Sequence, residues 1–453
     1  MIRKRARLCK WLVRSLVLPW DKGKRLFDGI SDWRKCKGRR FSVSQVLTEA
    51  LVGLVMGKFS LQAIEEAGSK VGCVVRQMFG LVKWASDNTV GRVVARVNWK
   101  ELRERLWMQV RGFRERKQVE HDALPIGALA IDGKTVAVSR QRMSQFAQAS
   151  EHKAKTKEGK VKKWTSYKLH MLRCVVTSFR QRLCVWQEPV GPGENEITAA
   201  KRTLKELFKK DKGKFLFELV TFDAMLMVYS ITKMISEAGR HWLSVLKENQ
   251  PELLQAAQNW FRPGPGDRPE WKIGPIKDHE FYKEYRIWRT SSLARWVTSH
   301  DWNHLKQVWC VEVIRYVRVG RGRGKKAELV VHDRTVRYYA TSLPEERFTA
   351  AQCLELVRSH WNIEDDVFNA LDCVFEEDTR KPFTTGEGTL NMSTLRLMAY
   401  NLLQMIRRRK QKNHTWDKRQ VWESWKNTID SVCHALCQFY PWSVVRGEKM
   451  LTI

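Results

Sequence analysis

The chain has 453 residues and a large excess of positive charge. Its 82 lysines and arginines outnumber 49 aspartates and glutamates, so the formal net charge is +33, and 43% of the residues are hydrophobic. A chain of this length and apolar content is expected to bury cores in two or three domains. The charge predicts binding to a polyanion, and charge alone leaves DNA, RNA and anionic lipid as candidates.

The apolar segments and the cysteines disfavour a membrane or secreted protein. The longest apolar stretch, residues 50–56, is far shorter than the roughly 20 residues that span a bilayer. Arg14 interrupts the apolar part of the basic N-terminus, which disfavours a signal peptide. Ten scattered cysteines without a CxxC pair favour a reducing, cytoplasmic compartment, and the group Cys433-His434-x-x-Cys437 is interpreted as a helix face rather than a zinc site.

The first part of the chain is predicted to be helical. Residues 1–40 read as a basic amphipathic arm, and residues 41–122 as a helical domain that is expected to bind DNA. Apolar residues recur at a spacing of three and four over 43–55, and Ser60 can cap a second helix for which Gly68 suits the end.

A third helical run is predicted from Asn88 to Val110. Basic residues are spread along it among apolar ones. This pattern is compatible with a helix lying across a phosphate backbone, although a charged run on a helix is usually a solvated face. DNA contact by this run is therefore one of two open interpretations.

A second domain begins near Leu124 with the β-rich run PIGALAIDGKTVAVS, and residues 123–259 are assigned to the first part of this domain. Residues 139–163 are polar and basic, which predicts an exposed, mobile loop. Two strands, YKLHMLRCVVTS and QRLCVWQEPV, precede a helix over 196–209, and a strand, a helix and the strand WLSVLK follow. Strands that alternate with helices predict an α/β layer around a mixed sheet.

The rest of the chain is divided into three parts. Residues 260–343 form a predicted β-rich insertion, in which two strands flank the hairpin turn GRGRGKK. Residues 344–405 return to the core with a helix over 350–371, and residues 406–453 are predicted basic helices. The tryptophans near the C-terminus are interpreted as core or dimer-interface residues, with base stacking as the alternative: Trp416, Trp422, Trp425 and Trp442.

Three acidic residues stand in contexts that suit metal ligands. Asp132 lies within the apolar run ALAIDGKT, before Gly133, which would let a backbone or phosphate approach closely. Asp223 ends the apolar run ELVTFDA, and Glu364 lies on a predicted helix four residues after His360. A carboxylate in an apolar strand is costly unless it is hydrogen-bonded, paired or metal-bound, and for each acid alone a capping or surface role is the alternative. Phosphodiester cleavage by two metal ions needs carboxylates that converge from separate elements.

Seven segments carry a resemblance to a known family, and the resemblance extends over most of the chain. They are RRFSVSQVLTEALVGLVMGKFSLQAIEEAG, AIDGKT, NEITAAKRTLKEL, TFDAM, VLKENQPEL, YYATSL and RSHWNIEDDVFNALDCVFEED. Their order and spacing are more specific than any one of them, since the three acids are 91 and 141 positions apart. On these residues the chain resembles bacterial insertion-sequence transposases of the DDE class, in the group with a β-rich insertion close to the H-repeat-associated proteins.

The resemblance implies a fold, a site and a reaction. The fold is an α/β ribonuclease-H-like mixed-sheet catalytic domain with a β-rich insertion, an N-terminal helical domain and C-terminal helices. Asp132, Asp223 and Glu364 would hold two Mg²⁺ ions, with Mn²⁺ as a substitute, for cleavage at element ends and strand transfer into target DNA. The implied partner is double-stranded DNA, bound by a homodimer at the bacterial nucleoid. Five further residues would lie at the mouth of the site and bind DNA: Lys134, Lys247, Arg358, His360 and Trp361.

The chain also departs from the broader family near its glutamate. The family often has Tyr, Arg and Lys at set spacings around the glutamate, where this chain has Val357, His360 and Leu371. Asp365 and Asp366 replace a stretch that more often contains Asn, so the third acid is less firmly assigned than the first two. Two alternative functions stay open: a metal-dependent nuclease that never joins DNA, and a basic DNA-binding protein without catalysis.

Overall fold

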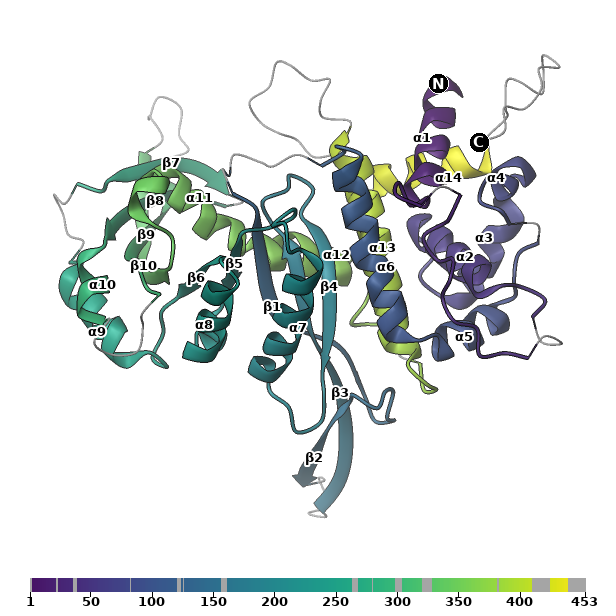
Figure 1. The fold of residues 1–453 in the computed structure, drawn as a ribbon, viewed down its shortest axis with the longest axis horizontal. Helices are drawn as coiled ribbons and strands as arrows, with labels where there is room; N and C mark the ends of the chain where they lie inside the picture. Colours follow the sequence, from purple (N-terminus) through teal and green to yellow (C-terminus); the bar gives the residue numbers. More distant parts are fainter. Residues whose placement is uncertain are drawn as a thin grey trace.

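The computed structural model contains a large mixed sheet beside a group of helices (Figure 1). It describes residues 2–438 except 22, 36–38, 82, 120–123, 125, 156–160, 263–267, 279, 298–303, 320–327, 381–382 and 410–423. No helix in this described part of the chain has both the length and the apolar character needed to cross a bilayer.

Ten strands form the sheet in the order β2-β3-β1-β5-β6-β10-β9-β8-β7, with β4 paired to β3 outside this path. Strands β1, β5 and β6 are parallel to one another, and the remaining pairs are antiparallel, which confirms the predicted mixed α/β sheet. The strands are β1 (Ala128–Ser139), β2 (Gln148–Lys155), β3 (Val161–Val176), β4 (Leu183–Val190), β5 (Leu219–Phe222), β6 (His241–Val245), β7 (Trp271–Asp278), β8 (Phe281–Thr290), β9 (Gln307–Val319) and β10 (Glu328–Thr341).

The strands of residues 260–343 continue the central sheet, because β10 pairs with β6 as well as with β9. The predicted hairpin is formed by β9 and β10, and its turn lies outside the described residues. Helices α9 (Pro251–Trp260) and α10 (Ser292–Val297) flank this end of the sheet (Figure 1). The boundaries of the six predicted domains stay a prediction.

Both faces of the central strands are covered. Val220 and Phe222 of β5 belong to the core that includes α7 (Glu196–Lys210) and α8 (Tyr229–Glu237). Leu219 belongs instead to the core that includes α11 (Ala350–His360). A short strand that is buried throughout is expected at the centre of a parallel sheet, and β5 has this pattern.

The helical part packs against one edge of the sheet through α13 (Gly388–Arg409), which contacts β4 and several other helices. The first helix of the helical part, α1, buries an apolar face and contacts α14, the last described helix. Residues 2–15 are therefore a packed helix rather than a free arm. The helices of this part are α1 (Ile2–Ser15), α2 (Val43–Val55), α3 (Leu61–Lys70), α4 (Cys73–Met78), α5 (Asp87–Arg96), α6 (Trp99–Glu115) and α14 (Trp425–Cys437).

Two helix predictions in this part need correction. The helix capped by Ser60 continues through Gly68 to Lys70, and a side chain at Gly68 would collide with the Trp84 indole. The glycine is therefore used for close packing rather than to end the helix. The predicted run over 88–110 is two helices, α5 and α6, because the chain turns at residues 97–98 and Asn98 caps α6.

The predicted loop over 139–163 is confirmed only for residues 140–147, which form neither helix nor strand, and is wrong for the described residues that follow. Residues 148–155 form β2 and residues from 161 onward form β3, and the two strands pair to make an antiparallel ribbon. The two strands carry polar residues on both faces, so they lack the alternation of polar and apolar residues by which strands are predicted. That alternation arises only when one face of a sheet is buried. In Figure 1 the ribbon extends below the rest of the molecule.

The tryptophans and cysteines of the C-terminal part are structural within the described residues. Trp425 packs against Phe375 and Tyr400, and Cys433 on α14 lies 3.2 Å from the Met56 carbonyl oxygen through its Sγ. These contacts support the helix-face interpretation of the Cys433 group. The other three C-terminal tryptophans of that prediction lie outside the described residues.

Candidate active site

Strand pairing places Asp132 and Asp223 at the same level of the sheet. Ile131 of β1 pairs with Phe222 of β5, and each aspartate is the next residue in its chain segment. Asp132 lies within β1, whereas Asp223 follows the end of β5 directly. Because β1 and β5 are parallel neighbours, both carboxylates emerge at one region of the sheet.

Glu364 lies in a π-helical segment, Ile363–Phe368, which connects α11 to α12 (Asn369–Cys373). The helix predicted over 350–371 is therefore present, but it is interrupted after α11 and its turns widen at the glutamate. Single π-helical turns occur frequently at functional sites. This segment contacts β1, the strand that carries Asp132.

The three acids interact electrostatically across these elements. Burial, followed by the charges of Glu364, Glu196 and Asp223, raises the pKa of Asp132 to about 7. The pKa of Glu364 is also raised, first by burial and then by Asp365 and Asp223. Carboxylates that raise one another's pKa lack enough positive charge between them.

A lysine supplies part of this missing charge. The Lys247 ammonium, just beyond β6, lies 3.0 Å and 3.1 Å from the two carboxylate oxygens of Asp223. Lys247 also lowers the pKa of Glu364, as does Arg337 of β10. Both partners of the Lys247–Asp223 pair are substantially exposed, so the pair is open to exchange with a ligand.

The acids suit a divalent cation by their chemistry, although the site is not closed around one. Among the described residues, no group of three or more His, Cys, Asp or Glu side chains is close enough to hold a metal ion. Asp132, Asp223 and Glu364 nevertheless offer oxygen donors, which Mg²⁺ and Mn²⁺ prefer, and they repel one another in the absence of a cation. The donor type and the excess of negative charge fit a divalent metal.

The predicted close approach at Gly133 is present, but the neighbouring group is a pair of side chains, Glu196 and His170, rather than a backbone or a phosphate. Glu196, at the start of α7, bonds to His170 Nε2 at 2.6 Å. A side chain at residue 133 would collide with Glu196 and would lie 2.8 Å from His170 Nε2. A larger residue at position 133 would therefore displace this pair from its place against β1 beside Asp132.

Two of the five residues predicted to contact DNA are largely buried against protein partners. Lys134 is largely buried, and its ammonium lies 2.5 Å from Asp372 in α12. The His360 ring is buried and its Nδ1 lies 2.9 Å from the Thr221 hydroxyl oxygen, an arrangement that ties α11 to β5. Burial lowers the pKa of His360 to about 4, so the ring is neutral near pH 7. This placement gives His360 a role in holding α11 against β5, and its contact with DNA stays a prediction.

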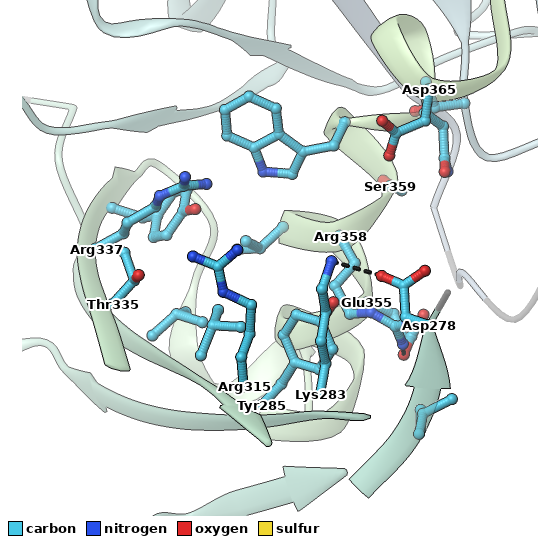
Figure 2. Close-up of a pocket in the computed structure, with 18 of the residues that line it drawn as sticks. Asp278, Lys283, Tyr285, Arg315, Thr335, Arg337, Glu355, Arg358, Ser359 and Asp365 are labelled. Atoms are coloured by element: carbon cyan, nitrogen blue, oxygen red, sulfur yellow. Dashed lines mark hydrogen bonds and ion pairs between the residues drawn. The ribbon is translucent and has the colours of Figure 1, made fainter. Parts of the chain in front are cut away.

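Arg358 and Trp361 line a pocket of about 650 Å³ between α11 and the curved strands β8–β10. Figure 2 shows Arg315, Arg337 and Lys283 extending from the strands toward the helix that carries Arg358. The wall also includes Trp361, whose ring lies 5.0 Å from the guanidinium carbon of Arg337. The pocket adjoins the acids, because Asp365, the neighbour of Glu364, is in its lining.

Two further residues belong to the site, although they were not predicted from the sequence. Glu196 lies within the segment NEITAAKRTLKEL, but nothing local distinguishes this glutamate of the first helical turn from others on α7. Arg337 lies in a β-rich strand far from the acids in sequence, and only the β10–β6 pairing brings it to the site. In both cases only the position in the folded protein identifies the residue, and no local sequence pattern does so.

Comparisons with known proteins identify the family of this chain. The family described as "Transposase DDE domain" matches residues 124–402, more than half of the chain. YhhI of Escherichia coli (strain K12), named as H repeat-associated, is 24% identical over 391 residues, which cover 84% of this chain and 90% of YhhI. YbfL of the same strain is 24% identical over 389 residues, with 84% and 90% covered. YncI of Escherichia coli O157:H7 is 24% identical over 391 residues, with 83% and 85% covered.

The matched region begins just before β1 and ends within α13, so it contains the whole sheet and the three acids. A DDE transposase domain implies a ribonuclease-H-like fold, to which the mixed α/β sheet conforms. Proteins of this family generally use divalent metal ions and act on DNA. On the extent of the match and the similarity to the H repeat-associated protein, the chain belongs to the DDE transposases of bacterial insertion sequences.

Proposed function

We propose that the chain cleaves DNA strands at the ends of its element and joins the released 3′ ends to target DNA. The observation that supports the proposal is the placement of Asp132 and Asp223 at one level of the paired strands β1 and β5, with the π-helical segment of Glu364 in contact with β1, beside a pocket rich in cations. Like charges gathered at one place cost stability unless a ligand neutralises them.

In this proposal Asp132, Asp223 and Glu364 hold two magnesium ions. When bound, the ions would supply charge neutralisation and polarise the phosphodiester, as in other two-metal sites. The role of the protein is to keep the oxygen donors on rigid elements: a central strand, the end of its parallel neighbour and a packed helix. Lys247 shields Asp223 in the absence of these ions and then becomes available to a DNA phosphate.

The DNA strand is proposed to run from the acids into the pocket. Arg358 is partly exposed on the pocket wall and forms a pair with Glu355 that phosphate could replace, because such surface pairs are weak. Trp361 presents an indole beside Arg337, a combination that suits a base and its phosphate. Lys134 and His360 act indirectly, by fixing β1 to α12 and α11 to β5.

The proposal also includes the oligomeric state and the cellular location of the protein. Two copies would hold two element ends together, since one copy presents one set of acids. The protein would work on nucleoid DNA in the bacterial cytoplasm. The net charge of +33 supports association with long DNA, because it favours release of counterions from the phosphate backbone.

A strand-transfer assay tests the function. The full chain is incubated with a labelled duplex that carries the terminal repeat, a supercoiled plasmid, and Mg²⁺ or Mn²⁺. Joined products are expected, and the DNA flanking the gene supplies the repeat sequence. Hydrolysis without joining would replace the proposal by a nuclease, and saturable binding without any cleavage would replace it by a DNA-binding protein.

Matched variants test which acid completes the site. Glu364→Gln is expected to abolish cleavage, whereas Asp365→Asn is expected to keep most of it. Burial raises the pKa of both residues most. Among the charges, Asp365, Asp223 and Lys247 act on the pKa of Glu364, whereas Asp366, Lys283 and Asp278 act on that of Asp365. Abolished cleavage in Asp365→Asn with normal activity in Glu364→Gln would reverse the assignment.

A further inference from the structure

The β2–β3 ribbon carries an unusual concentration of exposed cations. Lys153 and Lys155 of β2 and Lys162 and Lys163 of β3 are exposed, and none has a carboxylate partner among the described residues. The paired segments of the ribbon contain one acid, Glu151. The end of the ribbon far from the core, from residues 153 to 155 and 161 to 163, is exposed, whereas Tyr167 nearer its base packs against an apolar cluster.

The register places like charges opposite each other. Lys153 pairs directly with Lys163, and Lys155 lies two residues further along the same face. Opposed like charges destabilise an antiparallel pair. The next pair, His152 with Trp164, is stacked at 5.3 Å between ring centroids on the other face, and it stiffens the ribbon where the lysines repel. The arrangement is costly for the chain alone and favourable once a polyanion lies on it.

The length of the ribbon sets how far from the active site it reaches. Asp132 is opposite Arg173 in β3, and Lys163 is ten residues further along that strand. At about 3.3 Å per residue, the strand places Lys163 up to about 33 Å from the acids. This distance is close to one turn of duplex DNA, which is about 34 Å.

We propose that the β2–β3 ribbon is a duplex-DNA-binding arm that holds the phosphate backbone about one helical turn from the cleaved bond. The proposal rests on the proposed function for its choice of DNA as the polyanion. A two-stranded ribbon fits the major groove, and cations on both of its faces suit contact with the phosphates on the two sides of that groove. Lysine contacts to phosphate hold DNA without reading its sequence.

The test measures binding to a duplex of arbitrary sequence over a range of salt concentrations. All proteins are full-length and carry Asp132→Asn, so that DNA is not cut. The double variant Lys153→Ala and Lys163→Ala is compared with Lys205→Ala and Lys209→Ala on α7, which removes the same charge from two exposed lysines elsewhere. Replacing both ribbon lysines by arginine serves as the charge-conserving variant.

The ribbon double variant is expected to bind on the order of tenfold more weakly. The slope of log affinity against log salt should fall by about 0.9 for each DNA phosphate that the variant no longer neutralises, so by nearly 2 for the two lysines. The α7 variant should change the slope much less, and the arginine variant should bind as the parent does. Thermal unfolding should show no decrease in stability of the alanine variant, because a repulsive pair has been removed.

Three outcomes would overturn the proposal. They are an unchanged salt slope in the ribbon variant, an equal change in the α7 variant, or a change in oligomeric state by sedimentation with unchanged DNA affinity, which would point to a second protein chain. The outcome is separable from that of the proposed function. If the chain with Asp132 intact never cleaves or joins DNA, but binding still depends on the ribbon lysines, the proposed function is refuted and the DNA-binding role of the ribbon stands.

Discussion

Charged side chains are treated in opposite ways in two parts of this protein. In the interior of the protein, buried charges are matched within the chain. Arg173 of β3 is fully buried and places one nitrogen 2.8 Å from both carboxylate oxygens of Glu377, and Arg240 is buried against Asp211 at 3.2 Å. These ion pairs connect separate elements, and each buried cation has a carboxylate of the same chain as its partner.

At the acids the matching is left incomplete. Asp132 and Glu364 have raised pKa values because of burial and neighbouring carboxylates, and the nearby cation of Lys247 is exposed and paired with Asp223. This difference distinguishes the structural ion pairs, which we call the frame and which include Arg173–Glu377 and Arg240–Asp211, from the active site. A buried charge with a partner belongs to the fold, whereas a charge without one is available to a ligand. Substitutions at the two kinds of position should therefore have opposite consequences for stability and activity.

The largest effect is expected at Asp132. Asp132→Asn should lower Mg²⁺-dependent cleavage of terminal-repeat DNA by at least about a thousandfold, because one oxygen donor and its charge are removed. Gel-shift binding should be nearly unchanged, and stability should not fall, since a repelling charge has been removed. Cleavage at the parental rate would remove Asp132 from the mechanism and end the comparison.

The second effect is a decrease in the stability of the frame. Glu377→Gln leaves the Arg173 guanidinium buried without a counter-charge, which should cost about 3–5 kcal/mol in the free energy of unfolding. Urea unfolding at pH 7 measures it. A cost below about 1 kcal/mol would show that this buried pair is not a stabilising part of the frame.

The third effect depends on pH and concerns Glu49, a buried acid in α2 that accepts hydrogen bonds from an amide and a glutamine side chain. Burial raises its pKa to about 7, against the opposing hydrogen bonds from the Ala85 amide and the Gln45 side chain. The folded state holds this proton more tightly than the unfolded chain, so Glu49 should reduce stability as pH rises from about 4.5 to about 7.

Glu49→Gln should remove this dependence. The difference in unfolding free energy between variant and parent should shift in favour of the variant by on the order of 3 kcal/mol between about pH 4.5 and about pH 8. Unfolding curves of both proteins across this range measure it, and the subtraction cancels the titration of other groups. Parallel pH profiles would mean that the folded state does not raise this pKa.

The smallest effect is expected for an ion pair on the surface, which is neither a buried matched pair nor part of the active site. Glu115→Gln breaks an exposed pair with Arg111 on α6, which should cost less than about 0.5 kcal/mol. Unfolding under the conditions used for Glu377→Gln provides the direct contrast between an exposed and a buried pair. Equal costs at the two positions would contradict the distinction between buried and exposed charges.

Much of the fold is accessible from sequence because its central elements have strong local patterns. The apolar strand around Asp132, the strand ending at Asp223 and the helix that begins at residue 350 are predicted, and the structure contains each. Predictions fail where local pattern and tertiary role diverge. Gly68 lies inside a helix because Trp84 packs on it, and the β2–β3 ribbon lacks the apolar alternation by which strands are recognised.

The amino-acid sequence by itself determined the types of chemistry present: an excess of cations, three carboxylates at a characteristic spacing, and the alternation of strands with helices. Only the tertiary structure decided which groups meet. It buried His360 against Thr221, brought Arg337 and Glu196 to the acids, and joined the inserted strands to the central sheet. Pairing between β10 and β6 and the packing of α11 are long-range events, and no local pattern encodes the partner that a buried side chain will find.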